Sequence, residues 1–254
     1  MTASTDPHSY KMGLMEHLRE LRKRLLYSLV AISCGAIVAY CYSSEVFHAL
    51  CSPYYLAFGN SPLIGTGPAE AWMLKIKVAI FCGILITSPI LFYQLWLFVA
   101  PGLYQREKRL ILPFVILSTA LFTGGAWFCY QQILPLTLTF FYQEFRSINI
   151  SPTIKIGDHL SMTITTLLGF GFVFEMPLLA FFLARAGIID HHVLIRFFRH
   201  AIVAIFIIAA ALTPPDVFTQ LLMAGPLLVL YGISIVIAYF ASQPHRAPEA
   251  SCPT

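Results

Sequence analysis

The hydrophobic residues of this chain fall into six long runs that short polar segments separate. Because a membrane-crossing helix needs about 17–25 mostly apolar residues, we predict spans near 26–43, 78–100, 110–133, 161–184, 200–213 and 217–240. The longest polar stretches are the two tails and the loop around 142–158, so there is little room for a separate soluble domain. The pattern predicts an all-α membrane protein with six transmembrane helices.

The fifth run is shorter than the others. Only the twelve residues AIVAIFIIAAAL lie between His200 and Thr213, and a helix of that length reaches about 18 Å against a hydrocarbon core of about 30 Å. We therefore expect either that the following turn, TPPD at 213–216, is recessed below the membrane surface or that the bilayer thins around it.

A different pattern precedes the first run. Leu14, Leu18, Leu21 and Leu25 recur at helical spacing among charged residues, which predicts an amphipathic helix that lies in the membrane interface and leads into the first span. A basic segment before an apolar run is also typical of a secretory signal peptide. No A-x-A-like cleavage site follows, and the run is long enough to span, so we favour a retained helix.

The composition supports a polytopic membrane protein and gives its orientation. Of the 254 residues, 58% are hydrophobic and 11% charged, against about 25% charged in soluble domains. Lysine and arginine concentrate in the N-terminal segment and in the loops 101–110 and 185–199. Since short cytoplasmic loops carry the excess of these residues, we expect both termini in the cytoplasm. The net charge of +4 reflects this asymmetry, and no nucleic-acid partner is expected.

An acidic residue stands inside the fourth run. Glu175 interrupts LGFGFVFEMPLLAFF (168–182), and Pro177 follows two residues later. A carboxylate at membrane depth is expensive and generally functional, whereas a proline removes a backbone hydrogen bond and kinks the helix. Asp216 and Gln220 are also carried toward the membrane interior. We favour helix N-capping for Asp216, but capping does not explain Gln220.

Other polar residues have structural interpretations. Glu20 precedes Arg24 by four residues, which predicts a helix-surface ion pair, and Glu70 and Lys77 share a helix face, where a structural ion pair or a snorkelling lysine is expected.

The cysteines and histidines show no metal-binding spacing. Cys41 and Cys51 both lie toward the outer side and could pair, and the adjacent His191 and His192 are expected in a solvated loop.

Six short segments, in this order and spacing, resemble the TatC family, the polytopic core of the twin-arginine protein translocase. They are HLRELRKRL (17–25), the proline of SPYY (Pro53), EAWMLKIK (70–77), FVAPGLYQREKR (98–109), FGFVFEMP (170–177) and TPPDVFTQ (213–220). The resemblance implies a cupped bundle whose fifth and sixth helices are short. It implies one domain, 14–242, between tails at 1–13 and 243–254, with structural roles for Pro53, Glu70, Lys77 and Pro177.

The resemblance also implies a receptor for folded cargo with a twin-arginine signal peptide. The matching positions Glu20 and Glu107 would bind the two arginines, whose guanidinium groups pair bidentately with carboxylates. Further matching positions that would shape this surface are Arg22, Phe98, Pro101 and Tyr104.

A second implied site lies within the membrane. Single-span partners, TatA and TatB, would dock near polar positions, which are Glu175, Thr213, Asp216 and Gln220. The family resemblance further implies a homo-oligomer within a larger complex, contact with membrane lipid, no cofactor, a bacterial cytoplasmic membrane and transport driven by the proton gradient. Gly232 follows Leu230-Tyr231 where family sequences often have glutamate, so no role of that glutamate carries over.

Two alternatives remain open. A proton-coupled small-solute transporter could use Glu175 in a proton relay, although such transporters commonly show inverted repeats, and this chain has none that we can detect. An intramembrane enzyme would need a nucleophile–base pair or a metal set, and no such motif occurs.

Overall fold

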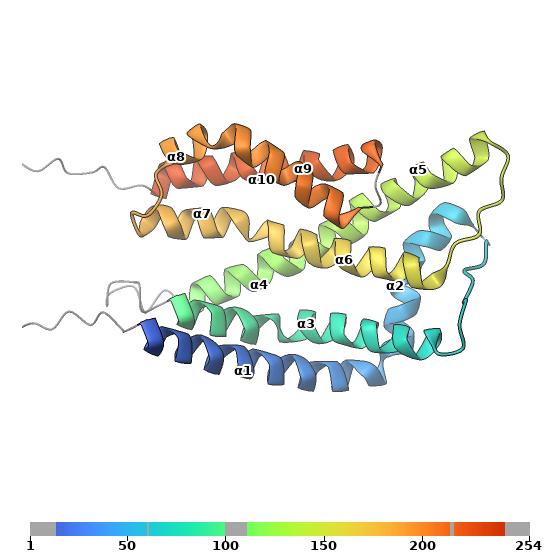
Figure 1. Cartoon of the computed structure of the whole chain (residues 1–254), viewed down its shortest axis with the longest axis horizontal. Coiled ribbons are helices and arrows are strands. Elements are labelled where there is room, and N and C mark those ends of the chain that lie inside the picture. The colour runs from blue at the N-terminus through green and yellow to red at the C-terminus, as the bar shows by residue number, and fades with distance from the viewer. Residues whose placement is uncertain (1–13, 60, 100–110, 214–215, 242–254) are drawn as a thin grey trace, which may run out of the picture.

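Long helices run side by side along one axis of this molecule (Figure 1). The computed structural model describes residues 14–59, 61–99, 111–213 and 216–241. Within those ranges there is no β-strand, only an isolated bridge between Ile64 and Lys155. The helices are α1 (Leu14–Cys41), α2 (Ser43–Phe58), α3 (Glu70–Val99), α4 (Ile111–Phe128), η3 (Cys129–Ile133), α5 (Leu134–Ser147), α6 (Ile156–Phe174), α7 (Met176–Arg185), α8 (His191–Arg196), α9 (Phe198–Leu212) and α10 (Val217–Ala241).

The helices confirm the predicted fold class. Five helical stretches are long and apolar enough to cross a membrane, and α9 is a shorter apolar helix; the five are Met15–Cys41, Glu70–Val99, Ile111–Ser147, Ile156–Arg185 and Val217–Ala241. The start of α1 and the end of α10 lie at the same end of the bundle (Figure 1). We call this the terminal end and the opposite one the far end.

The first helix differs from its prediction. The segment 14–25 is not a separate interfacial helix, because α1 runs unbroken for 28 residues, about 42 Å at 1.5 Å per residue. No proline lies within α1, and its first half is rich in leucine, arginine and glutamate, which favour helix. The amphipathic segment is therefore the first part of the span itself.

Helix α2 occupies residues that the sequence pattern leaves as a loop. Pro53 lies inside α2 and is buried. Proline has no N–H to donate to the carbonyl four residues earlier, and that carbonyl, of Ala49, instead accepts a 2.7 Å hydrogen bond from the Tyr130 hydroxyl. Cys41 and Cys51 are both free thiols in the structure, the first exposed and the second buried, so they do not form the disulfide that the sequence allowed.

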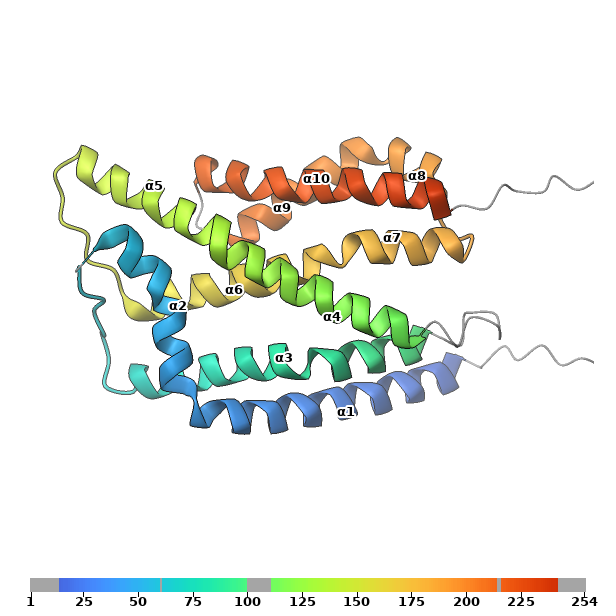
Figure 2. The ribbon, with the colours of Figure 1, turned by 180° about the vertical axis from the view of Figure 1, so that it is seen from behind.

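The third predicted span is longer than expected. Helices α4 and α5 continue each other through the π-helical turn η3, giving the helical stretch Ile111–Ser147, which crosses the bundle obliquely in Figure 2. The predicted loop at 142–158 is therefore wrong for residues 142–147. Pro135 has no backbone N–H to donate, and the wider π turn just before it lets the helix continue without that hydrogen bond.

The fourth predicted span breaks where expected. Helix α6 ends at Phe174, Glu175 joins it to α7, and Pro177 stands in the first turn of α7. Because Pro177 cannot donate to the carbonyl of Val173, the helix cannot continue regularly through this point.

The last helices agree only in part with expectation. Helix α9 is short, at 15 residues, and it ends well before the far end reached by α3 and α5 (Figure 1). Helix α10 has 25 residues, so the prediction of a short sixth helix is wrong. His191 and His192 begin α8 rather than lying in a loop.

Candidate functional site

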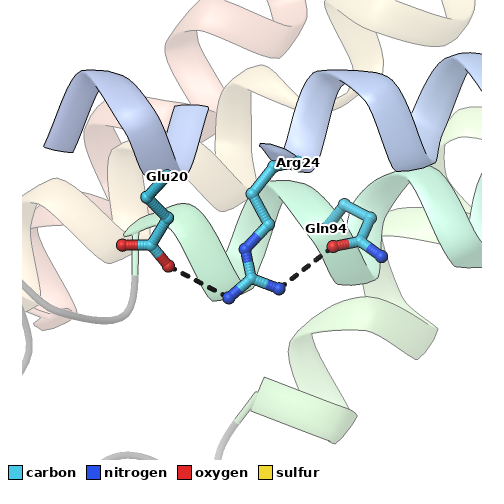
Figure 3. Close-up of polar contacts among 3 residues, drawn as sticks. All are labelled: Glu20, Arg24 and Gln94. Atoms are coloured by element: carbon cyan, nitrogen blue, oxygen red, sulfur yellow. Dashed lines mark hydrogen bonds and ion pairs between the residues drawn. The ribbon is translucent and has the colours of Figure 1, made fainter. Parts of the chain in front are cut away.

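The first candidate site lies at the terminal end, where α1 meets α3. Arg24 of α1 donates from Nη2 to Glu20 Oε1 at 3.0 Å and from Nη1 to Gln94 Oε1 of α3 at 3.1 Å (Figure 3). The predicted ion pair between Glu20 and Arg24 is present, and both side chains are partly buried. One guanidinium group thus connects a carboxylate on α1 to an amide on α3.

An aromatic contact supports the same helix pair. The rings of His17 in α1 and Phe98 in α3 stack with centroids 4.3 Å apart. The predicted residue Phe98 thus contacts α1, and it lies about one helical turn from Gln94 on α3. Arg22, also predicted, is exposed on α1. The other predicted members of this site, Glu107, Pro101 and Tyr104, lie outside the described residues. Sequence patterns alone do not reveal Gln94 and His17, because their partners come from another helix.

The second candidate site surrounds Glu175, whose exposed fraction is only 6%. The Ser118 side chain of α4 lies close enough to interact with the Glu175 carboxyl group, and Trp96 Nε1 of α3 donates to Ser118 Oγ at 2.9 Å. Glu175 Oε1 has no hydrogen-bond partner among the described residues. A buried polar atom without a partner is costly, so this oxygen retains capacity to bind a donor.

An apolar groove of about 430 Å³ is lined by residues on both sides of Glu175 in the chain, although Glu175 itself does not line it. Its walls come from three parts of the chain: α4, the α6–α7 break and α10. The lining residues nearest Glu175 in sequence are Phe174 and Pro177, and α10 contributes Leu230 and Ile233. The groove therefore runs beside the one acidic residue that the sequence places in this membrane span.

The remaining polar positions lie where α9 ends and α10 begins, and one of them, Gln220, connects the two helices. Gln220 Nε2 donates to the Phe206 carbonyl of α9 at 3.0 Å, and Thr213 Oγ1 donates to the Ala209 carbonyl at 2.9 Å. Asp216 caps α10, because Oδ1 accepts from the Thr219 amide at 2.7 Å. The favoured interpretation of Asp216 as an N-cap is thus confirmed. No described contact joins Gln220 to Glu175, so these positions do not form one cluster.

Two predicted structural residues do not pair with each other. The Glu70 carboxylate accepts backbone N–H groups of Thr66, Gly67 and Gly157, whereas Lys77 donates to Ser161 Oγ at 3.0 Å. The expected ion pair between Glu70 and Lys77 is therefore absent from the described contacts. Glu70 instead fastens the 65–67 segment and the start of α6 to α3.

Comparison with known proteins gives one family. The family model described as Sec-independent protein translocase protein (TatC) matches residues 16–226. A protein of that name from Desulforapulum autotrophicum is 42% identical over 227 residues, covering 89% of this chain and 84% of its own length. One from Carboxydothermus hydrogenoformans is 41% identical, covering 90% and 93%. A crystal structure of the twin arginine translocase receptor TatC matches with a TM-score of 0.82 at 38% identity, covering 89% of this chain and 99% of that one.

Proposed function

Because this chain belongs to the TatC family of Sec-independent protein translocase proteins, we propose that it is a receptor that binds twin-arginine signal peptides of folded cargo. The chain is a multi-pass membrane component of that translocase, and its family is not one of catalytic enzymes. The proposal concerns which residues bind the signal and where the partner subunits dock.

The Glu20 carboxylate carries the proposal. It already holds a guanidinium group, that of Arg24, through one oxygen. An arginine of a signal peptide is the same chemical group, so it can take the place of Arg24 or bind beside it. Arg24 would keep its hydrogen bond to Gln94 during such an exchange. Glu107 would bind the second arginine, as the family resemblance implies.

The test is crosslinking of a twin-arginine signal peptide to the full-length protein in membranes. Glu20→Gln keeps the size of the side chain and removes its charge, and we expect crosslinking to fall at least tenfold, because a charge-assisted bidentate pair is lost. Glu16→Gln is the matched control, since Glu16 is an exposed acid one turn earlier on α1. Equal crosslinking in both variants would contradict the assignment of Glu20.

We further propose that the groove beside Glu175 receives an apolar helix, either the hydrophobic part of the signal or a single-span partner. The groove walls are apolar, and the buried Glu175 carboxyl group can accept a hydrogen bond from a polar group on that helix once its side chain turns toward the groove. Such a bond contributes about 0.6–2 kcal/mol, which sets the register of the helix while allowing exchange.

Photocrosslinking from Leu117 or Ile233, which line the groove, tests this proposal against labels at Val38, which is exposed on α1. We expect adducts with signal or partner helices from the groove positions only. Glu175→Gln retains hydrogen bonding but cannot ionise; transport equal to that of the parent shows that ionisation is not required. Solute uptake by the purified protein in liposomes would instead support the transporter alternative.

The remaining parts of the proposal concern membrane placement and partners. Both termini face the cytoplasm of a bacterium, a proposal that the basic loops support and with which the shared end of α1 and α10 agrees (Figure 1). TatA- and TatB-like single-span proteins dock near α9 and α10, and the protein works as a homo-oligomer driven by the proton gradient. Attaching a cysteine-reactive, membrane-impermeant label from either side at an introduced terminal cysteine tests the orientation.

A further inference from the structure

A second cavity, of about 340 Å³, lies at the far end of the bundle. It is bounded by α2, by the segment before α3, by the first turns of α3 and by the start of α6 (Figure 1). Its apolar wall includes Phe47, Leu74 and Ile156, and its polar groups include His48 and Lys75. Neither the signal-binding proposal nor the groove beside Glu175 uses this cavity.

The charged side chains around the cavity differ in how many hydrogen-bond or ion-pair partners they have. Glu70 also lines it, and its carboxylate accepts hydrogen bonds from the backbone N–H groups of Thr66, Gly67 and Gly157, which partly offset its charge. Lys75 is exposed, and no described carboxylate lies within ion-pair distance of its ammonium group. His48 is exposed on α2 and can add an N–H donor. Lys75 and His48 therefore bring donors to the cavity, and no described ion pair engages Lys75.

The position of Lys75 along α3 places these donors at a particular membrane depth. Helix α3 has 30 residues, about 45 Å, and exceeds a hydrocarbon core of about 30 Å by about 15 Å. Centring the helix leaves about five residues beyond the core at each end, so Lys75 stands near the boundary between acyl chains and headgroups. Tyr42 and Trp72 are exposed nearby in the chain, as expected of aromatic side chains at the membrane interface.

We propose that this cavity binds one phospholipid, with its phosphate group on Lys75 and His48 and the start of an acyl chain against Phe47 and Leu74. The observations that carry the proposal are the ammonium group without a described ion-pair partner, the apolar wall beside it and the depth of Lys75 near the membrane interface. The lipid fills the space between α2 and α3. It thereby supports the position of α2 beside the start of α3.

The experiment measures lipids retained by the full-length protein in detergent, using native mass spectrometry. The probes are phosphatidylglycerol and a diacylglycerol with the same acyl chains, which lacks the phosphate. We expect Lys75→Met to lower phosphatidylglycerol retention about fivefold and to leave diacylglycerol retention unchanged. Lys77→Met is the matched control two residues away, because Lys77 donates to Ser161 and does not line the cavity.

The outcomes separate the proposal from its alternatives. Phosphatidylglycerol retention that is equal in Lys75→Met and the parent overturns the proposal, as does an equal loss in the two lysine variants. Inorganic phosphate is a third probe: if its binding depends on Lys75 and lipid retention does not, the cavity is a soluble-anion site and the lipid proposal fails. If Lys75→Met fails to fold, Lys75→Arg is tested instead. Because this variant keeps the positive charge, we expect it to retain phosphatidylglycerol. A loss of phosphatidylglycerol in Lys75→Arg would also refute the proposal.

Discussion

The α1–α3 pair and the α9–α10 pair are held together by different means. Helices α1 and α3 approach closely at two glycines, and a Cβ atom on Gly83 would lie 2.7 Å from the Ala36 backbone nitrogen. They also share the hydrogen bond from Arg24 to Gln94 at the terminal end. Helices α9 and α10 likewise share a side-chain hydrogen bond, from Gln220 to the Phe206 carbonyl, but no glycine of α10 makes a comparably close approach.

The difference matters because water does not drive helices together inside a bilayer. Close packing through small residues and interhelical hydrogen bonds are the two main alternatives. Packing along α1 and α3 fixes that pair through shape over a long surface. The described α9–α10 contacts include one interhelical side-chain hydrogen bond, from Gln220, which is weak enough to be exchanged. This contrast agrees with the proposal that partner helices dock on the α9–α10 side.

The largest expected effect comes from filling the glycine contact. Gly83→Val would place a branched side chain against the α1 backbone, and we expect a loss of about 3 kcal/mol in the free energy of unfolding. Thermal unfolding in detergent measures it. Gly124→Val is the control, because a Cβ there meets nothing within 4 Å. Similar losses in both variants would show that the α1–α3 contact is not specific.

Removal of the cap at the α9–α10 turn is expected to matter less. Asp216→Ala leaves the Thr219 amide without its acceptor, and we expect about 1 kcal/mol of destabilisation. Asp190→Ala provides the comparison, since Asp190 stands at the N-cap of α8 but makes no side-chain cap hydrogen bond. The same thermal assay should show almost no change for Asp190→Ala; an equal change would argue against capping.

The interhelical bond of Gln220 is expected to have a smaller effect still. Gln220→Leu keeps similar size and removes the donor to Phe206, and measured bonds of this kind average about 0.6 kcal/mol. Gln132→Leu serves as control, because Gln132 is exposed and makes no hydrogen bond to a described residue. A loss above about 3 kcal/mol for Gln220→Leu would mean that the α9–α10 pair is not easily exchanged.

The smallest expected change is a gain in stability on α10. A Cβ on Gly232 meets nothing within 4 Å, so Gly232→Ala should stabilise the helix by about 0.5 kcal/mol. Gly125→Ala should act in the opposite direction, because its Cβ would lie 2.6 Å from Phe174 Cγ. Unfolding midpoints that shift in the same direction would show that crowding does not decide the effect of these glycines.

The long apolar runs predict the spans because lipid requires a continuous apolar surface over a fixed length. Helix α2 is not predicted by this reasoning, because it does not span the membrane and because Pro53 in its middle suggests that a helix ends there. The extension of α5 to Ser147 is missed because its residues become polar while the helix continues past the apolar run. The Glu20–Arg24 pair is local and predictable, whereas Gln94 and Ser118 become visible only when α3 and α4 are placed beside their partners.

The short helix α9 has a mechanical consequence for the surrounding lipid. Its 15 residues reach about 22 Å, whereas neighbouring helices are long enough for a full bilayer. The bilayer is therefore thinned beside α9 and keeps its ordinary thickness on the opposite side of the molecule. Compressed lipid behaves as a strained elastic sheet, and the strain falls when two compressed zones merge. Neighbouring proteins with short flanks would therefore be drawn toward α9 through the bilayer before any side chains touch.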